Sequence, residues 1–380
     1  MTAKIAVFLD GTWNDPEADT SITELYRRAR RLYGDDVAVY VEGVGVRFPK
    51  LGGGAFGWGL NTQIIEGYVA LVERWMRAER AAIAAGVPVE EARRGAAEIS
   101  LFGFSRGAFS ARSLAGMIAK CGLLPPGTGG PDGLDASDVF ARYRNRRRPG
   151  WREMDSGEAP AQTDEDRLVL DHARRVHIRF IGVFDTVGAL GVPGRFGSAA
   201  SRRYAFHDTN LSGFVQTARH ALALDELRST FPPTLWTSVP IPLPGRRLDV
   251  EQRWFVGAHS DVGGGLSGRL RDSLVPSVPR EWMAAESTTA GLPLAPEPAP
   301  STNALGDLDE PQKSLVFTVA AALPHLADAP RHVKSTALGE TLDPSVLYRW
   351  TNRGDYQAVG RMRAPELWAW ITERKGAPTP

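Results

Sequence analysis

The segment 99–112 constrains the fold more than any other part of this chain, because it sets a serine between two glycines after an apolar run. Ser105 lies in the middle of Gly103-Phe-Ser-Arg-Gly107. The residues before it predict a buried strand over 98–103, and those after it predict a helix over 106–120. So sharp a turn leaves no room for side chains two residues before and after the serine. The pattern predicts a serine hydroxyl exposed at the carboxyl end of a strand.

Two further predicted strands end in residues that would complete a hydrolytic site with Ser105. The β-rich segment 176–184 runs into Asp185, and the apolar segment 253–258 runs into His259. A serine nucleophile needs a histidine base, and that base needs an acid to orient it. The chain order Ser105, Asp185, His259 is the order of α/β-hydrolases and not of other Ser-His-Asp folds. These three residues are the predicted catalytic set.

Other roles for these residues stay open. Asp185 would also serve as a turn cap after its strand, and His259 would also fit a buried structural position. Asp261 is a competing acid two residues after His259, or a residue that holds its own loop by bonding to the backbone. His220 lies in 211–228, which we expect to be helical, and there it would be a packed histidine.

The amino terminus is expected to supply an oxyanion hole. A buried strand over 4–9 leads into Asp10, Gly11 and Thr12. In α/β-hydrolases one donor is the backbone N–H after the nucleophile, here Arg106, and the other comes from an earlier loop, here Gly11 or Thr12. Asp10 is a structural residue, an alternative acid, or a ligand with other carboxylates for Mg or Ca. No second histidine stands at ligand spacing, so we expect no metal and no cofactor.

Predicted strands and helices alternate along the chain. Strands are expected at 4–9, 37–41, 98–103, 176–184 and 253–258, and helices at 60–80, 106–120 and 211–228. This alternation favours an α/β fold of the α/β-hydrolase-like type, with a mainly parallel sheet and helices on both faces. With 380 residues, 43% of them hydrophobic, the chain is long enough to form one domain over 1–380.

Three stretches interrupt the pattern. Residues 125–170 are rich in Pro, Gly and Asp and include a cluster of five arginines at 142, 144, 146, 147 and 148. We expect this insertion to cap the site near the catalytic edge and to meet an anionic head group. Residues 266–312 are expected to form an irregular loop. The glycine-rich segment 52–59 carries Phe56 and Trp58, which would suit the wall of an acyl pocket.

Charge and hydropathy limit the partners and the location. A formal net charge of +1 argues against a nucleic-acid partner. No segment approaches the roughly 18 consecutive apolar residues of a membrane span, and the first nine residues are too short for a signal peptide. We expect a protein that is cytoplasmic at synthesis, which leaves export by a signal-independent system open.

Five ordered motifs together resemble one bacterial family. They are Phe8-Leu-Asp-Gly-Thr-Trp-Asn14, Gly103-Phe-Ser-Arg-Gly-Ala108, Gly182-Val-Phe-Asp-Thr-Val-Gly-Ala-Leu-Gly191, His220-Ala-Leu-Ala-Leu-Asp-Glu226 and Gly257-Ala-His-Ser-Asp-Val-Gly-Gly-Gly265. They are similar to the α/β-hydrolase-like domain family that includes the first class of type VI secretion lipase effectors. The resemblance implies a Ser-Asp-His hydrolase with Ser105 as nucleophile and, for effector members, phospholipase activity. His220 and Asp225 also lie in a family motif.

The sequence therefore predicts a serine esterase or lipase acting on a phospholipid or another lipid ester. Its expected partners are that substrate, a peripherally contacted membrane, and an immunity or secretion-apparatus protein. Effector members tend to be longer and to carry a membrane-docking module, and nothing after residue 310 resembles one. The alternative is a non-catalytic or metal-binding interaction protein that keeps the hydrolase fold.

Overall fold

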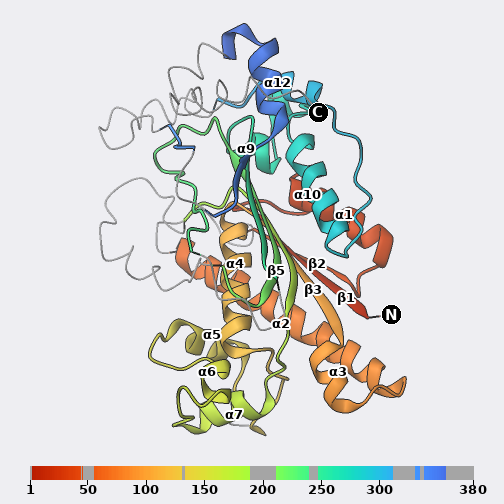
Figure 1. Ribbon diagram of the computed structural model, residues 1–380, viewed down its shortest axis with the longest axis vertical. Coiled ribbons are helices and arrows are strands. Elements are labelled where there is room, and N and C mark those ends of the chain that lie inside the picture. The colour runs from red at the N-terminus through yellow and green to blue at the C-terminus, as the bar shows by residue number, and fades with distance from the viewer. Residues whose placement is uncertain are drawn as a thin grey trace.

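The computed structural model describes residues 2–43, 45, 55–130, 133–188, 211–238, 247–310, 330–333 and 338–356. Within these residues the centre of the molecule is a seven-stranded sheet in the order β2-β1-β3-β4-β5-β6-β7, with every neighbouring pair parallel (Figure 1). The strands are β1 (Ala3–Leu9), β2 (Ala38–Val41), β3 (Ala97–Phe104), β4 (Ile178–Phe184), β5 (Val215–Ala223), β6 (Asp249–Phe255) and β7 (Glu340–Leu342).

Helices cover both faces of this sheet, so the expected α/β architecture is confirmed. One face packs against α1 (Ser21–Tyr33) and α10 (Ser277–Thr289), and the other against α2 (Ala55–Ala84) and α4 (Arg106–Cys121). The remaining helices are α3 (Val89–Gly95), α5 (Ala136–Arg144), α6 (Trp151–Asp155), α7 (Asp164–His172), α9 (His259–Gly263) and α12 (Pro344–Asn352), with the 3₁₀ turns η2 (Gly268–Leu270) and η3 (Ser301–Leu305).

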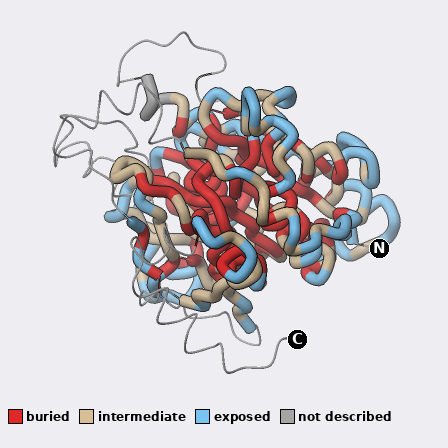
Figure 2. The backbone as a smooth tube through the Cα atoms, turned by 90° about the horizontal axis from the view of Figure 1, so that it is seen from above, coloured by how far each residue is buried: buried red, intermediate tan, exposed pale blue. Residues whose placement is uncertain are grey.

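The two faces of the sheet bury two separate apolar clusters. Along β1, Val7 and Leu9 join the cluster under α2 and α4, whereas Ala6 and Phe8 join the cluster under α1 and α10. Successive strand residues point to opposite faces, so a strand covered on both sides must be apolar along its whole length. Figure 2 shows this buried centre.

The segment 211–228 is a correction to the expected secondary structure. It contains the central strand β5 (Val215–Ala223), not a helix. The Ala-Leu-Ala-Leu residues favour a helix on their own, but this segment pairs with β4 on one side and β6 on the other and is buried through most of its length. Strand pairing and burial outweigh the small differences in intrinsic helix propensity.

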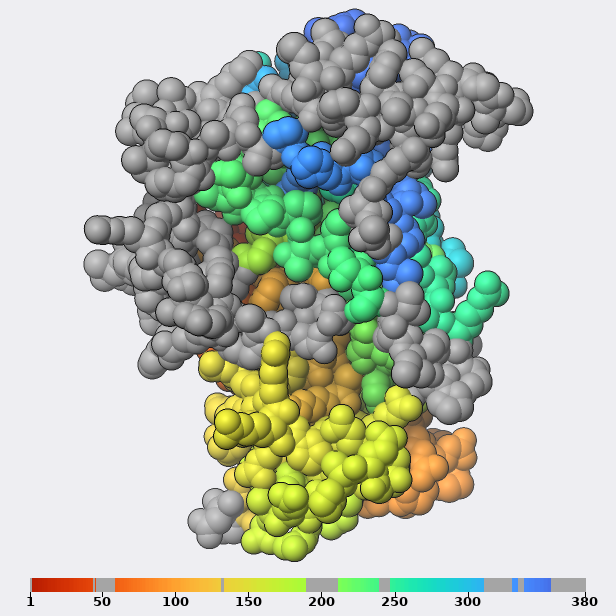
Figure 3. Space-filling model, turned by 60° about the vertical axis from the view of Figure 1, so that its left-hand side comes forward, coloured from red at the N-terminus to blue at the C-terminus, as the bar shows by residue number. Residues whose placement is uncertain are grey.

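The insertion is also in a different place from the one expected. The chain leaves α4 at Leu123 and returns at Arg174, and these two residues form an antiparallel bridge. We call residues 123–174 the insertion lobe; it contains α5, α6 and α7 and forms one end of the molecule (Figure 3). Because α4 first carries the chain a full helix length away from Ser105, the lobe does not lie at the catalytic edge as expected (Figure 1).

Two other stretches differ from expectation or lie outside the description. Residues 266–312 are not irregular throughout, because they contain α10, whose Val278, Met283 and Ala284 are buried against the sheet. Gly52, Gly53 and Gly54, and the side chains of Phe56 and Trp58, lie outside the described residues.

Candidate active site

The turn after β3 has the strained geometry that its glycines predict. Ser105 has a φ of 57° and a ψ of −120°. A Cβ at Gly103 would come within 2.5 Å of the carbonyl oxygen of Gly107, and a Cβ at Gly107 within 2.2 Å of that of Leu9. Glycine is required at both positions because any side chain would collide with backbone.

Ser105, His259 and Asp185 form one continuous hydrogen-bonded chain. Ser105 Oγ lies 2.8 Å from His259 Nε2, and His259 Nδ1 lies 2.5 Å from Asp185 Oδ2. A carboxylate only accepts, so Nδ1 carries the proton and Nε2 is left to accept from the serine hydroxyl. Ser105 was expected to be exposed, but only 6% of its surface is accessible, because it packs beside His259 and Gly11.

Neighbouring strands hold the three side chains in place. The backbone N–H of Ser105 donates to the Phe184 carbonyl at 3.0 Å, and that of Asp185 donates to the Ala221 carbonyl at 2.7 Å. Asp185 follows β4 with a φ of 38°, and His259 begins α9 shortly after β6. The carboxyl ends of parallel strands meet at one edge of a sheet, and the site is built there.

Arg331 is a residue of this site that the sequence did not point to. Its guanidinium donates to both carboxylate oxygens of Asp185 and also to the carbonyls of Ala223 and Phe231. Burial alone would raise the pKa of Asp185, but the charge of Arg331 and the hydrogen bond from His259 hold it well below its usual range. Arg331 lies in 330–333, where no strand, helix or motif marks it.

Among the described residues, the His259 ring is hydrogen-bonded to Asp185 and Ser105 and not to Asp261. The Asp261 carboxylate accepts hydrogen bonds from the backbone N–H groups of Ala258 and Asp309, each at 2.9 Å from Oδ2. Burial raises the pKa of Asp261 to about 7 against the effect of these bonds. The position corresponds to the loop-holding role left open above.

Asp10 is a buried support of the amino-terminal loop. It accepts hydrogen bonds from the hydroxyls of Thr20 at 2.5 Å and Tyr40 at 2.9 Å. Burial raises its pKa to about 6, and the hydrogen bond from Thr20 opposes that rise. In the described part of the chain, no three His, Cys, Asp or Glu side chains are grouped as a metal site would require.

The candidate oxyanion donors lie around Ser105. Gly11 is next to the serine, since a Cβ built on it would lie 3.3 Å from Ser105 Cβ. Its N–H, however, donates to Asp10 Oδ1 at 2.6 Å. Thr12 follows in the same loop, and Arg106 is the first residue of α4. The guanidinium of Arg106 lies 5.9 Å from the centre of the half-exposed Trp13 ring.

The His259 ring packs against two aromatic side chains. The centres of the Phe104 and Phe231 rings are 4.7 Å and 5.1 Å from it. The backbone N–H of His259 donates to Glu226 at 3.3 Å, and Arg228 binds the same carboxylate. The sequence reasoning gave no role to Glu226, although it ends the motif 220–226, and it missed Phe231, which follows in a segment without a site pattern.

His220 lies outside this chain of hydrogen bonds. It is buried in β5, where its Nε2 accepts from the backbone N–H of Thr186 at 3.1 Å and its Nδ1 lies 3.3 Å from Gln252 Oε1. Burial lowers its pKa to about 3, so it remains neutral. It is a packed histidine as expected, although in a strand.

The chain matches one known protein family over most of its length. The family described as the catalytic domain of Tle1-like type VI secretion phospholipase effectors matches residues 3–286. The chain belongs to this family. The resemblance inferred from the five motifs is therefore confirmed, and the matched region includes Ser105, Asp185 and His259 but not Arg331.

The other proteins to which the chain is similar are distant or match only part of their length. An uncharacterized protein of Saccharomyces cerevisiae is 33% identical over 142 residues, which are 37% of this chain and 19% of the yeast protein. A crystal structure of an uncharacterized protein from Pseudomonas aeruginosa is 16% identical with a TM-score of 0.38, covering 82% of this chain and 48% of that one. A structure of the Tle1 effector bound to the VgrG spike of the type 6 secretion system is 17% identical with a TM-score of 0.32, covering 70% and 52%.

The Tle1-like chain thus spans about half the length, or less, of these relatives. No helix in its described residues combines the length and the apolar character that crossing a bilayer requires.

Proposed function

We propose that this chain is a serine hydrolase that cleaves carboxylic esters of lipids, phospholipids first among them. The observation that carries the proposal is the unbroken path from Ser105 Oγ through His259 to Asp185, with contacts of 2.8 Å and 2.5 Å. A serine that shares its proton with a histidine held by a buried carboxylate is the arrangement that makes a hydroxyl nucleophilic.

The mechanism follows from this geometry. Ser105 Oγ attacks the ester carbonyl carbon while His259 Nε2 takes its proton, and Asp185 stabilises the resulting imidazolium. His259 then protonates the leaving alcohol as its bond to the carbonyl carbon breaks. Water repeats the cycle on the acyl-enzyme and releases the fatty acid and Ser105.

The oxyanion that forms in each half of the cycle lies at the amino end of α4. The backbone N–H of Arg106 and the dipole of a 16-residue helix favour negative charge there. Of the two loop candidates, Gly11 already donates to Asp10, and this favours the N–H of Thr12 as the second donor.

The substrate class rests on the family, whose members are phospholipase effectors. Delivery through a type VI secretion apparatus, with a spike or immunity protein as partner, is part of the same proposal. The interaction-module alternative predicts binding without turnover.

The test is release of fatty acid from vesicles of phosphatidylethanolamine and phosphatidylglycerol, followed by mass spectrometry, beside hydrolysis of a short-chain soluble ester. The wild-type protein should act on both substrates, and Ser105→Ala on neither. Hydrolysis of the soluble ester alone would contradict phospholipid as the substrate but would support the serine hydrolase activity. Equal activity in Ser105→Ala would contradict both the phospholipid substrate and the serine hydrolase mechanism. Loss of activity with a chelator, followed by recovery with Mg or Ca, would favour the metal-binding alternative.

A further inference from the structure

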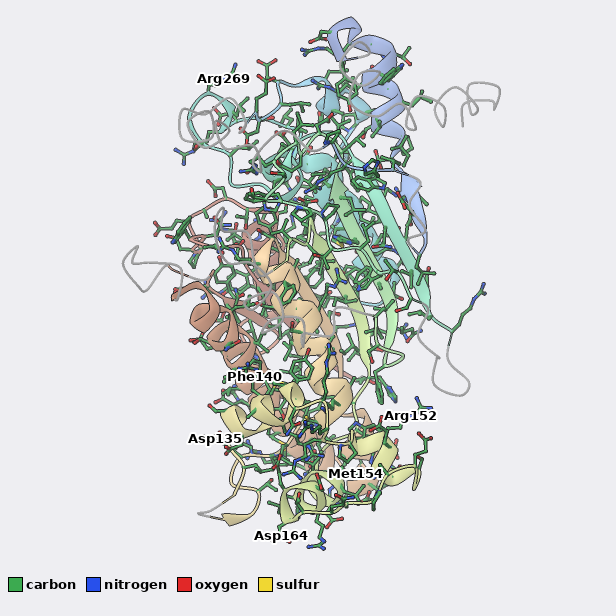
Figure 4. The ribbon with its side chains drawn as sticks, turned by 90° about the vertical axis from the view of Figure 1, so that its left-hand side faces the viewer. Asp135, Phe140, Arg152, Met154, Asp164 and Arg269 are labelled. Carbon is green, nitrogen blue, oxygen red and sulfur yellow. The ribbon has the colours of Figure 1, made fainter. Side chains whose placement is uncertain are left out.

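A cavity lies at the insertion lobe, and the proposed hydrolysis makes no use of it. Its volume is about 520 Å³. Lys120 from the last turn of α4 lines it, with Arg146 and Arg148 from the turn after α5 and Arg152 and Glu153 from α6. Figure 4 shows Arg152 on α6 at the same end of the molecule as α5 and α7, with Arg269 at the other end.

The lining is strongly cationic, with four basic side chains and one carboxylate. Glu153, the carboxylate, accepts a hydrogen bond from the backbone N–H of Gly150 at 2.9 Å. The guanidinium of Arg148 donates a hydrogen bond to the Thr163 hydroxyl at 2.9 Å and forms ion pairs with Glu165 and Asp166. Arg152 is exposed and makes no ion pair with any described residue.

Lys120 is a cation whose hydrogen bonds, among the described residues, go to neutral groups. Its ammonium donates to the backbone carbonyls of Asn145 at 2.7 Å and Tyr143 at 3.3 Å, which use two of its three N–H donors. Burial lowers the pKa of Lys120, and the nearby charges of Arg142 and Arg146 act in the same direction, whereas Cys121 and Glu153 oppose this shift. An anion in the cavity would lower the energy of all these charges together.

We propose that this cavity binds a phosphate group. Three arginines and one lysine line the same space, and together they suit the several oxygens of a phosphate better than the two oxygens of a carboxylate. The volume leaves room for a second phosphate or for the organic group that carries the first.

This phosphate is not that of the lipid being hydrolysed. Lys120 lies near the far end of α4, about 20 Å along the helix axis from Ser105. The phosphate of a glycerophospholipid is separated from its ester carbonyls by only a few bonds, so one molecule cannot occupy both places. The cavity is a separate site, and the inference does not depend on the hydrolase activity.

The experiment is calorimetric titration of the full chain with inorganic pyrophosphate at low ionic strength. The expected result is binding that weakens at high salt and that falls about tenfold or more in Arg146→Gln/Arg152→Gln, because charge-assisted hydrogen bonds are lost. Both side chains are exposed, so the variant should keep the unfolding midpoint and the soluble-ester activity of the wild type. Lys120→Gln, which can still donate to the Asn145 carbonyl, should weaken binding as well.

The matched control is Arg269→Gln, which removes one exposed positive charge at the other end of the molecule and should bind as wild type does (Figure 4). A second arm measures co-sedimentation of the Ser105→Ala protein with vesicles of phosphatidylglycerol and phosphatidylcholine in equal parts. Loss of vesicle binding in the double variant would show that the bound phosphate belongs to a lipid head group. Binding of pyrophosphate without binding of vesicles would show that it belongs to a free phosphate compound. Binding of neither probe, or equal binding by the double variant and the control, would overturn the proposal.

Discussion

Ser105 and Asp185 both have a positive φ, at 57° and 38°, which residues with a Cβ seldom adopt. Each conformation directs a polar side chain towards His259 from the end of its strand. Strain of this kind persists only where surrounding contacts hold it. Here Gly103 and Gly107 clear the space around Ser105, and Arg331 holds Asp185.

Asp185→Asn should reduce turnover of a soluble ester by roughly 10³- to 10⁴-fold, because an amide favours the wrong tautomer of His259. KM should change little, since Asp185 is fully buried behind the histidine. Steady-state kinetics check this result. A nearly active Asp185→Asn beside an inactive Asp261→Asn would give the orienting role to Asp261.

Asp261→Asn should keep activity and raise stability above neutral pH. The folded pKa of Asp261 is about 7 and the unfolded value is 3.8, so between these values the folded state binds more protons and stability falls as pH rises. An amide oxygen can still accept from Ala258 and Asp309 without the cost of a buried charge. Urea unfolding should show the variant more stable at pH 8 and similar to wild type at pH 4; an equal change at both pH values would contradict this account.

Arg331→Met should lower kcat roughly 10- to 100-fold by removing charged hydrogen bonds to Asp185. Without that positive charge the carboxylate stabilises the imidazolium more, so the acid limb of the kcat/KM profile should move to higher pH. Arg331→Lys keeps the charge but not the fork, and should recover part of the rate. A rate loss with an unmoved pH profile would mean that Arg331 only supports folding.

At the scale of elements, α4 connects two different regions of the molecule. Its amino end meets Ser105, and its carboxyl end carries the insertion lobe. The lobe has its own small apolar cluster around Trp151, Met154 and Val169. An ion pair between Arg142 of α5 and Asp166 of α7 also joins its helices. The exposed fraction is 0% for the Arg142 side chain and 1% for the Asp166 side chain.

Arg142→Met should destabilise the protein by about 3 kcal/mol, because Asp166 would remain buried with a weaker partner. Urea unfolding measures this loss, and activity per folded molecule should be unchanged since the lobe is remote from Ser105. Arg167→Met, which breaks the exposed pair with Asp164, is the matched control and should cost under about 1 kcal/mol. Similar losses in the two variants would contradict the account.

The elements that the sequence predicts well are those whose patterns are local. The turn at Ser105 and the strands β1, β3 and β4 were expected from apolar runs and glycine spacing. The strand β5 was not, because its alanines and leucines favour a helix until two neighbouring strands pair with it. The place of the insertion lobe also depends on the length and direction of α4, which no local motif specifies.

At the scale of the whole molecule, the parallel sheet brings residues that are far apart in the sequence together in one site. Ser105, Asp185 and His259 are separated by scores of residues, yet their strands are β3, β4 and β6 of one sheet and end at the same edge. Chain order and strand ends were enough to propose these three residues. Arg331 and Phe231 reach the site through long-range packing, which composition and spacing do not reveal.

The most direct measurement of the central claim is covalent labelling by a fluorophosphonate probe, with the modified residue mapped by mass spectrometry. An activated serine attacks the probe's phosphorus and stays phosphonylated, whereas an ordinary hydroxyl does not react. The account predicts one label per molecule, at Ser105, none in Ser105→Ala and much slower labelling in Asp185→Asn. No labelling of the folded wild-type protein, or equal labelling of Ser105→Ala, would contradict it.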